Sequence, residues 1–192
     1  LGFAQKEADT MRGIYSMTQT IFNMPCAFIT PITISIIPAI TSHLTLMDSR
    51  AARATEESAV RVTGLICMPC AFGLVALAEP VTALLGRYSG EKLVLATQLM
   101  TVLGICIIFN AIVLLTNAMM QAHGHAVAPV INMFAGGILK LAAVYILTGN
   151  RNIGIVGTPI GTLLCYLCTT TLNLISIRRC MTDAPAVIKN LV

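Results

Sequence analysis

Long stretches without a charged residue divide this chain. No Asp, Glu, Lys or Arg occurs between Arg12 and Asp48, and further charge-free runs cover 62–78, 93–139 and 152–177. A helix needs about 20 apolar residues to cross a bilayer, so 93–139 is long enough to cross twice. The pattern therefore predicts five membrane spans, which cover 13–41, 60–78, 93–121, 127–148 and 153–177.

The third and fourth spans need a turn between them. His123, Gly124 and His125 interrupt the apolar run, and Pro129 suits the first turn of a following helix. The runs are continuous, and each is much longer than the roughly ten alternating residues of a barrel strand. The fold class predicted for residues 1–192 is therefore all-α, a polytopic transmembrane helix bundle of about five spans.

The first span and the segment after it differ from a plain apolar helix. Pro25, Pro31 and Pro38 each remove a backbone donor, which predicts a bent or broken helix. Residues 42–59 are expected to form a charged loop on the cytoplasmic side. Residues 49–63 are rich in helix-forming residues, however, so the second span could begin earlier than residue 60.

The composition agrees with a membrane protein. Hydrophobic residues make up 56% of the chain and charged residues 10%, whereas a soluble domain usually has about 25% charged residues. The net charge of +4 lies in the connections between spans, so it does not indicate nucleic-acid binding. The sequence has no nucleophile beside a base and no phosphate-binding glycine loop. We therefore expect neither catalytic activity nor a cofactor.

The cysteines and histidines do not form a metal-binding pattern. The two CxxC pairs, Cys67/Cys70 and Cys165/Cys168, lie in apolar windows without a nearby His or acidic residue. Thiols in such windows behave as small hydrophobic groups. His123 and His125 flank a glycine at the turn and have no third ligand in the local sequence, so no metal site is expected there either.

Lys140 is the strongest candidate for a functional role because it lies inside the fourth span. A lysine at the bilayer centre costs about 2.5–3.5 kcal/mol, so it usually faces a cavity or a partner. Asn132 and Gly136 precede it by eight and four residues and are expected to form one stripe with it. Lys140 and Asn132 are therefore candidate substrate-binding residues. A lysine that snorkels to the surface and one that joins two helices are the alternatives.

Three further asparagines are candidates for the same role. Asn110 and Asn117 share a helix face with Cys106 and Gln121, and Asn23 stands four residues after Gln19 in the first span. Side chains of this kind either line a path or form hydrogen bonds between helices. We take Asn23, Asn110 and Asn117 as candidate substrate-binding residues and expect Asn173 only to pack between helices.

Several sequence strings occur together in the order and spacing of a known family. They are Phe22–Pro25, Ile36–Ile40, Gly64 to Pro80, Gln121 to Asn132, Gly137 to Lys140 and Gly154 to Thr162. With these strings the chain resembles the multidrug/oligosaccharidyl-lipid/polysaccharide (MOP) exporter superfamily. Within that superfamily it is most similar to the stage V sporulation protein B-like, polysaccharide-biosynthesis and lipid II flippase-like proteins. Ala122 departs from the family pattern, which usually has Gly there.

The resemblance implies that the chain is part of the second lobe of a MATE-like flippase. The first, N-terminal lobe would lie outside this sequence. Such a protein would span the bacterial cytoplasmic membrane several times and move a lipid-linked oligosaccharide or peptidoglycan precursor by alternating access. Its partners would be the lipid-linked sugar, the bilayer and the other lobe, and Lys140 would face an anionic group of the substrate.

Two other functions remain open at this point. A cation-coupled multidrug exporter of the same superfamily would be expected to bind its coupling ion through acidic residues inside the membrane, and the predicted spans contain none. An intramembrane lipid-modifying enzyme would need a catalytic histidine or acid at the membrane face, for which His43 and the pair His123 and His125 are the candidates.

Overall fold

The computed structural model describes residues 5–149 and 154–180, and this part of the chain is almost entirely helical. Its elements are α1 (Gln5–Thr45), α2 (Ser49–Ala76), α3 (Ala78–Gly86), α4 (Glu91–Ala122), α5 (Val127–Gly149), the 3-10 turn η1 (Gly154–Val156) and α6 (Gly157–Cys180). The all-α fold predicted from the sequence is confirmed.

Five of these helices are long and apolar enough to cross a membrane. They are α1, α2, α4, α5 and α6, which contain the five predicted spans within the described residues. The short helix α3 follows α2 after a single residue, Leu77. Residue 153, at the predicted start of the fifth span, lies outside the described residues.

The predicted loop 42–59 is instead mostly helical, and the alternative that the second helix begins earlier, in the helix-prone segment 49–63, agrees with the structure. Helix α1 continues to Thr45 and α2 begins at Ser49, so only residues 46–48 connect them. The Asp48 carboxylate caps α2 by accepting a hydrogen bond of 2.9 Å from the Ala51 amide. Glu57 also pairs with Arg53 and Arg61, one turn away on either side, at 3.3 and 4.0 Å. The charged residues therefore belong to a capped helix end.

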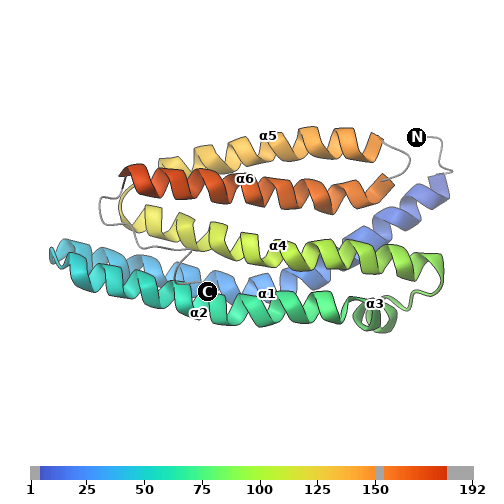
Figure 1. Cartoon of the computed structure of the whole chain (residues 1–192), viewed down its shortest axis with the longest axis horizontal. Coiled ribbons are helices and arrows are strands. Elements are labelled where there is room, and N and C mark those ends of the chain that lie inside the picture. Colours follow the sequence, from blue (N-terminus) through green and yellow to red (C-terminus); the bar gives the residue numbers. More distant parts are fainter. Residues whose placement is uncertain (1–4, 150–153, 181–192) are drawn as a thin grey trace.

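Helix α4 forms the centre of the bundle. Helices α1 and α2 pack against it on one side, and α6, paired with α5, packs on the other (Figure 1). One buried cluster joins Phe22 and Ile29 of α1 to Cys67 of α2 and to Leu103 and Ile107 of α4. Helix α4 therefore joins the pair α1 and α2 to the pair α5 and α6.

Helix α1 is continuous despite its three prolines. Pro31 and Pro38 face outward, and because proline has no N–H group, the carbonyls of Ala27 and Ile34 each lose their partner four residues later. Both of these residues are exposed in the bundle. Of the two predicted forms, a bent or a broken helix, the break is not observed, since helical geometry runs through all three positions.

Helices α5 and α6 approach each other closely at small residues. A Cβ atom on Gly136 would collide with the Thr169 hydroxyl and would lie 3.1 Å from the Cys165 carbonyl oxygen. A Cβ atom on Gly161 would lie 2.5 Å from Val144 Cγ2. Glycine at these positions lets the two backbones pack at a distance that a larger residue would prevent.

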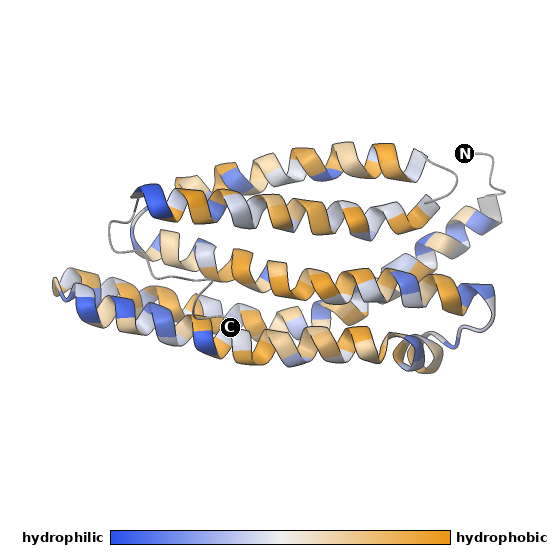
Figure 2. Cartoon of the chain, in the orientation of Figure 1, coloured by the Kyte–Doolittle hydropathy of each residue, from blue (hydrophilic) through white to orange (hydrophobic). Residues whose placement is uncertain are grey.

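Many large hydrophobic side chains are exposed on the bundle, and hydrophobic residues occur along each long helix (Figure 2). On α5, Phe134 is 72% exposed and Tyr145 is 84% exposed. On α2, the exposed face changes along its length, from Arg53 and Arg61 near the start to Leu65 and Phe72 farther on. Surfaces of this kind suit contact with hydrocarbon, and the change on α2 marks the level at which that helix enters it.

Candidate functional site

A chain of buried amides connects α4, α5 and α6. Asn173 of α6 donates hydrogen bonds to the Thr116 hydroxyl (2.9 Å) and to the Asn117 side-chain oxygen (2.8 Å) of α4. Asn132 of α5 donates to the Asn173 side-chain oxygen at 2.9 Å and to the Ser176 hydroxyl at 3.1 Å. Asn173 is completely buried. These residues form hydrogen bonds between helices, which the sequence left open as one of two roles for Asn117.

Asn173 is the centre of this network, although the sequence gave no reason to rank it above its neighbours. It follows three consecutive threonines in an apolar helix, and polar residues of this kind often only pack. A buried amide without a partner is costly. The conclusion that Asn173 has a structural role stands, and the structure adds that it links two candidate residues, Asn117 and Asn132.

Lys140 lies apart from this network, on an edge of α5 that is only partly buried. Its ammonium group is an electrostatic neighbour of the Cys106 thiol on α4 and of the Cys165 thiol on α6. No acidic side chain among the described residues forms an ion pair with it. Lys140 is therefore a basic residue inside a membrane span, within electrostatic range of thiols on two other helices and without an ion pair in the described part of the chain.

The other two candidate asparagines lie on or near α1. Asn110 of α4 donates a hydrogen bond of 3.2 Å to the Cys26 sulfur of α1. Asn23 is exposed on the outer face of α1, as is Gln19. The five candidate residues therefore occupy separate places: an interhelical network, the partly buried Lys140, a contact between α1 and α4, and the open surface of α1.

A crevice of about 230 Å³ lies between α1 and α4 near the buried network. Thr30, Thr33 and two isoleucines line it from α1, and Asn117 and Gln121 line it from α4. Asn117 thus contacts both the interhelical network and an open space. Asn117 is therefore a candidate residue that lies on the wall of a crevice.

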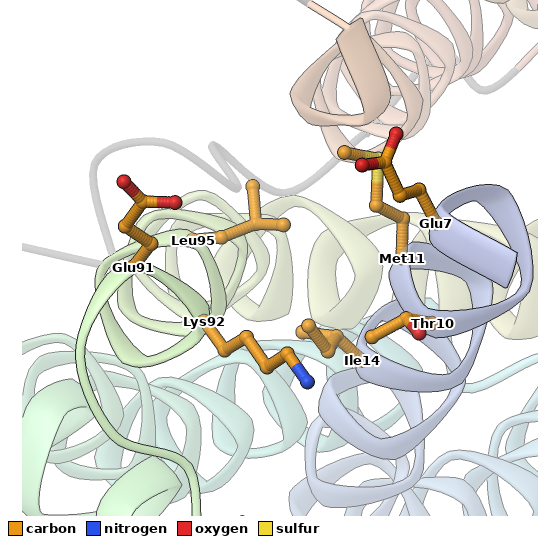
Figure 3. A pocket seen from close by; sticks show the side chains of 7 residues that line it. All are labelled: Glu7, Thr10, Met11, Ile14, Glu91, Lys92 and Leu95. Carbon is orange, nitrogen blue, oxygen red and sulfur yellow. The ribbon is translucent and has the colours of Figure 1, made fainter. Parts of the chain in front are cut away.

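A second crevice, of about 360 Å³, lies between the starts of α1 and α4. Glu7 and Met11 approach it from α1, and Glu91 and Leu95 approach it from α4, on the opposite side of the opening (Figure 3). The Lys92 side chain extends across it towards Ile14. This group of charged residues at the helix ends was not singled out from the sequence, because its two halves are more than 80 residues apart.

At the opposite end of the bundle, Glu56 of α2 contacts His123, the residue that caps α4. The Glu56 Oε1 and His123 Nε2 atoms are 2.6 Å apart, and Glu56 is only 2% exposed. The Thr41 hydroxyl of α1 donates a hydrogen bond of 3.4 Å to the Ala122 carbonyl beside it. The turn between α4 and α5 is therefore held by groups from both α1 and α2.

The neighbouring His125 is exposed, and the structure does not place it with His123 in a ligand cluster. No group of three or more His, Cys, Asp or Glu side chains suited to a metal ion occurs among the described residues. All six cysteines whose state is described have free thiols, and Cys26, Cys67 and Cys106 are buried. The interaction of His123 with Glu56 explains the presence of one histidine at this turn.

Comparison with curated proteins finds similarity to a membrane protein. Over 178 residues it is 24% identical to the uncharacterized membrane protein YabM of Bacillus subtilis (strain 168), a match that covers 93% of this chain and 32% of YabM. The chain thus spans about a third of the length of this curated relative.

The fold also matches a solved transporter. An inward-facing structure of a multidrug resistance MATE family transporter of the MOP superfamily aligns with a TM-score of 0.74 and 16% identity. The alignment covers 100% of this chain and 49% of the transporter chain, so the five-span bundle corresponds in fold to half of that protein.

A family match covers almost the whole sequence. The family described as lipid II flippase MurJ matches residues 7–192, which include every candidate residue named above. The resemblance to the MOP superfamily inferred from the sequence strings is confirmed by this match and by the fold. The chain belongs to the lipid II flippase MurJ family.

Proposed function

We propose that this chain forms part of the second lobe of a flippase that moves a lipid-linked oligosaccharide or peptidoglycan precursor across the bacterial cytoplasmic membrane by alternating access. The observation that carries this proposal is Lys140, a lysine inside a membrane span of a chain from the lipid II flippase family. The first lobe, outside this sequence, would form the other wall of the pathway.

The depth of Lys140 makes a passive role unfavourable. It lies nine residues before the end of α5, or roughly 14 Å along the helix axis. A lysine at such a depth costs a few kcal/mol unless water, a partner or a ligand solvates it. It is partly buried, near two thiols, and has no ion pair with a described acid. An anionic group of a lipid-linked headgroup, such as a diphosphate, would provide the missing partner.

The crevice between α1 and α4 offers a second part of the binding surface. Gln121 is exposed and presents its amide group there, and amides both donate and accept hydrogen bonds, as sugar hydroxyls do. Asn117 lines the same wall, with its oxygen accepting from Asn173 and its amide nitrogen donating to the Met133 sulfur. Asn110 and Asn23 lie on the same two helices. In this proposal Lys140 binds the charged group of the substrate, these amides contact its sugars, and the apolar outer surface leaves the lipid tail in the bilayer.

The orientation follows from the resemblance to the family, whose topology places 42–61 and 178–192 in the cytoplasm; Lys and Arg have only a small excess on that side, six against five on the other. Arg50, Arg53 and Arg61 on α2 and Arg178 and Arg179 at the end of α6 lie at the same end of the bundle as the Glu56 and His123 pair. Basic residues are enriched on the cytoplasmic side of membrane proteins. We therefore assign this end, including the first turns of α2, to the cytoplasm.

The test is transport by the full-length protein with Lys140 replaced. Lys140→Gln keeps a polar side chain of similar length and removes the charge, whereas Lys140→Arg keeps the charge. Loss of a charge-assisted contact costs about 1.5–3 kcal/mol, so the Gln variant should lose on the order of tenfold or more of its lipid II transport in proteoliposomes. The Arg variant should retain most of it.

Leu141→Ala is the matched control, because Leu141 is the next residue, is 74% exposed and points away from the other helices. It should insert and transport normally. Normal lipid II transport by correctly inserted Lys140→Gln would remove Lys140 from the mechanism. Export of cationic drugs with no movement of lipid II would instead support the multidrug exporter.

A further inference from the structure

The crevice between the starts of α1 and α4 lies at a membrane boundary. On α1, Glu7 precedes a run that carries no charge after Arg12. On α4, Glu91 and Lys92 directly precede the charge-free run 93–139. Both walls of the crevice therefore change from charged to apolar at the same end of the bundle, opposite the Glu56 and His123 pair (Figure 1). A molecule in this crevice would lie where headgroups meet hydrocarbon.

The lining has the two chemical parts of a lipid headgroup site. Glu7 and Glu91 present carboxylates on opposite sides of the opening, and Lys92 adds one ammonium group. Met11, Ile14 and Leu95 provide an apolar surface beside these charges. The volume, about 360 Å³, is at the lower end of the range of small-molecule sites.

None of the three charged groups pairs with another described side chain. The ion pairs of the described residues involve Glu56 and Glu57, not Glu7 or Glu91. Lys92 likewise has no hydrogen bond or ion pair with a described residue. The crevice thus combines two unpaired carboxylates and one unpaired ammonium group, with a formal charge of −1.

We propose that this crevice binds a zwitterionic phospholipid with a primary ammonium headgroup, namely phosphatidylethanolamine of the surrounding leaflet. The ammonium group of the lipid would donate hydrogen bonds to Glu7 and Glu91, and Lys92 would bind its phosphate. The first methylene groups of the acyl chains would lie along Met11, Ile14 and Leu95. This site is separate from Lys140 and does not depend on which substrate the protein transports.

The charges of the site favour an ethanolamine headgroup over the other common lipid headgroups. An anionic phosphatidylglycerol headgroup would bring a phosphate to Lys92 but would leave both carboxylates without a cation. A choline headgroup has a positive charge, but its three methyl groups cannot donate hydrogen bonds to carboxylates. The expected order of affinity is therefore ethanolamine, then choline, then glycerol.

Native mass spectrometry of the full-length protein tests this order directly. Detergent-purified protein is titrated with dioleoyl phosphatidylethanolamine, phosphatidylcholine or phosphatidylglycerol, and the retained lipid is counted. The ethanolamine lipid should bind at least severalfold more tightly than the other two. The Glu7→Gln/Glu91→Gln double variant should lose roughly threefold to tenfold of that affinity, because exposed charged contacts are individually modest.

Glu79→Gln is the matched control, since Glu79 is an exposed acid in the first turn of α3 and does not line the crevice. It should bind the ethanolamine lipid as the unmodified protein does. Equal retention of the three lipids by the unmodified protein would overturn the proposal without any variant. Unchanged affinity in the double variant would overturn the assignment to this crevice.

Discussion

The Nε2 atom of His123 lies 2.6 Å from the Oε1 atom of Glu56, although 67 residues separate them in the sequence. Glu56 belongs to the charged first turns of α2, and His123 ends α4. The contact joins the pair α1 and α2 to the turn that leads into α5. Because Glu56 is almost fully buried, it has little access to water if the histidine is removed.

His123→Ala should therefore destabilise the folded bundle. Leaving a buried carboxylate without its partner costs about 1–3 kcal/mol of folding free energy. We expect a loss in the lower half of that range, because the His123 side chain is 22% exposed. Glu56→Gln, which retains a hydrogen-bonding group and removes the charge, should cost less. The measurement is thermal unfolding of the detergent-solubilised full-length protein.

Glu57→Gln provides the comparison on the same helix. Glu57 pairs with Arg53 and Arg61, but its side chain is 30% exposed. Surface pairs one turn apart contribute about 0.3–0.5 kcal/mol. If Glu57→Gln lowers the unfolding temperature as much as His123→Ala does, the buried contact has no special importance.

Asn173→Ala should loosen α6 from both α4 and α5. The substitution removes three hydrogen bonds, to Thr116, Asn117 and Asn132. Hydrogen bonds between membrane helices average about 0.6 kcal/mol each, with a maximum near 1.7. We expect a total loss of roughly 1–3 kcal/mol in a steric-trapping or denaturant experiment in bicelles.

A double-mutant cycle separates the network from simple packing. Asn132→Ala and Asn173→Ala should be less than additive when combined, because each removes the same 2.9 Å hydrogen bond. Asn23→Ala, on the exposed face of α1, should leave stability unchanged. Full additivity between Asn132 and Asn173 would show that their hydrogen bond contributes nothing.

Gly136 and Gly137 give a direct test of the close approach of α5 and α6. A methyl group on Gly136 would collide with Thr169, whereas a methyl group on Gly137 would have no atom within 4 Å. Gly136→Ala should cost about 1–3 kcal/mol through forced separation of the helices. Gly137→Ala should be neutral or stabilising by up to about 1 kcal/mol. Equal unfolding temperatures for the two variants would contradict the packing of α5 on α6.

The membrane boundary on α2 can be located by chemical labelling. In a cysteine-free background, a cysteine at Ser58 should react with a membrane-impermeant maleimide, because Ser58 is exposed and Arg61 lies one turn farther along the helix. A cysteine at Phe72, which is 65% exposed but lies in the apolar part of the helix, should not react. Labelling of Ser58→Cys only in inside-out vesicles would support the cytoplasmic assignment, and labelling only in intact cells would reverse it.

The membrane spans could be predicted from the sequence because the absence of charge along 20 residues is itself the physical requirement for crossing. The start of α2 could not be predicted by the same reasoning. Outside the hydrocarbon, charged side chains are solvated and do not oppose helix formation. The ion pairs of Glu57 with Arg53 and Arg61 stabilise the helix there. A charge pattern that ends a membrane span therefore does not end a helix.

The side-chain contacts were harder to predict for two reasons. The stripe from Asn132 to Lys140 turns by about 80° over eight residues at 3.6 residues per turn, so the first residue faces α6 and the last lies on an edge of α5. The contact between Glu56 and His123 joins two distant segments, and no local pattern encodes such a pairing. The order of the family strings was sufficient for the fold but not for these contacts.

The prolines of α1 restrict the surroundings in which this helix can be stable. Ala27 and Ile34 are exposed, and their carbonyls lack the usual N–H partner four residues later. Unpaired carbonyls are unfavourable in hydrocarbon. This edge of α1 therefore favours a hydrated environment or donor groups from another part of the protein. The outward edge of α5, with Phe134 and Tyr145, carries no such requirement. The outward edge of α1 is thus more stable in a polar environment, whereas the outward edge of α5 is stable in hydrocarbon.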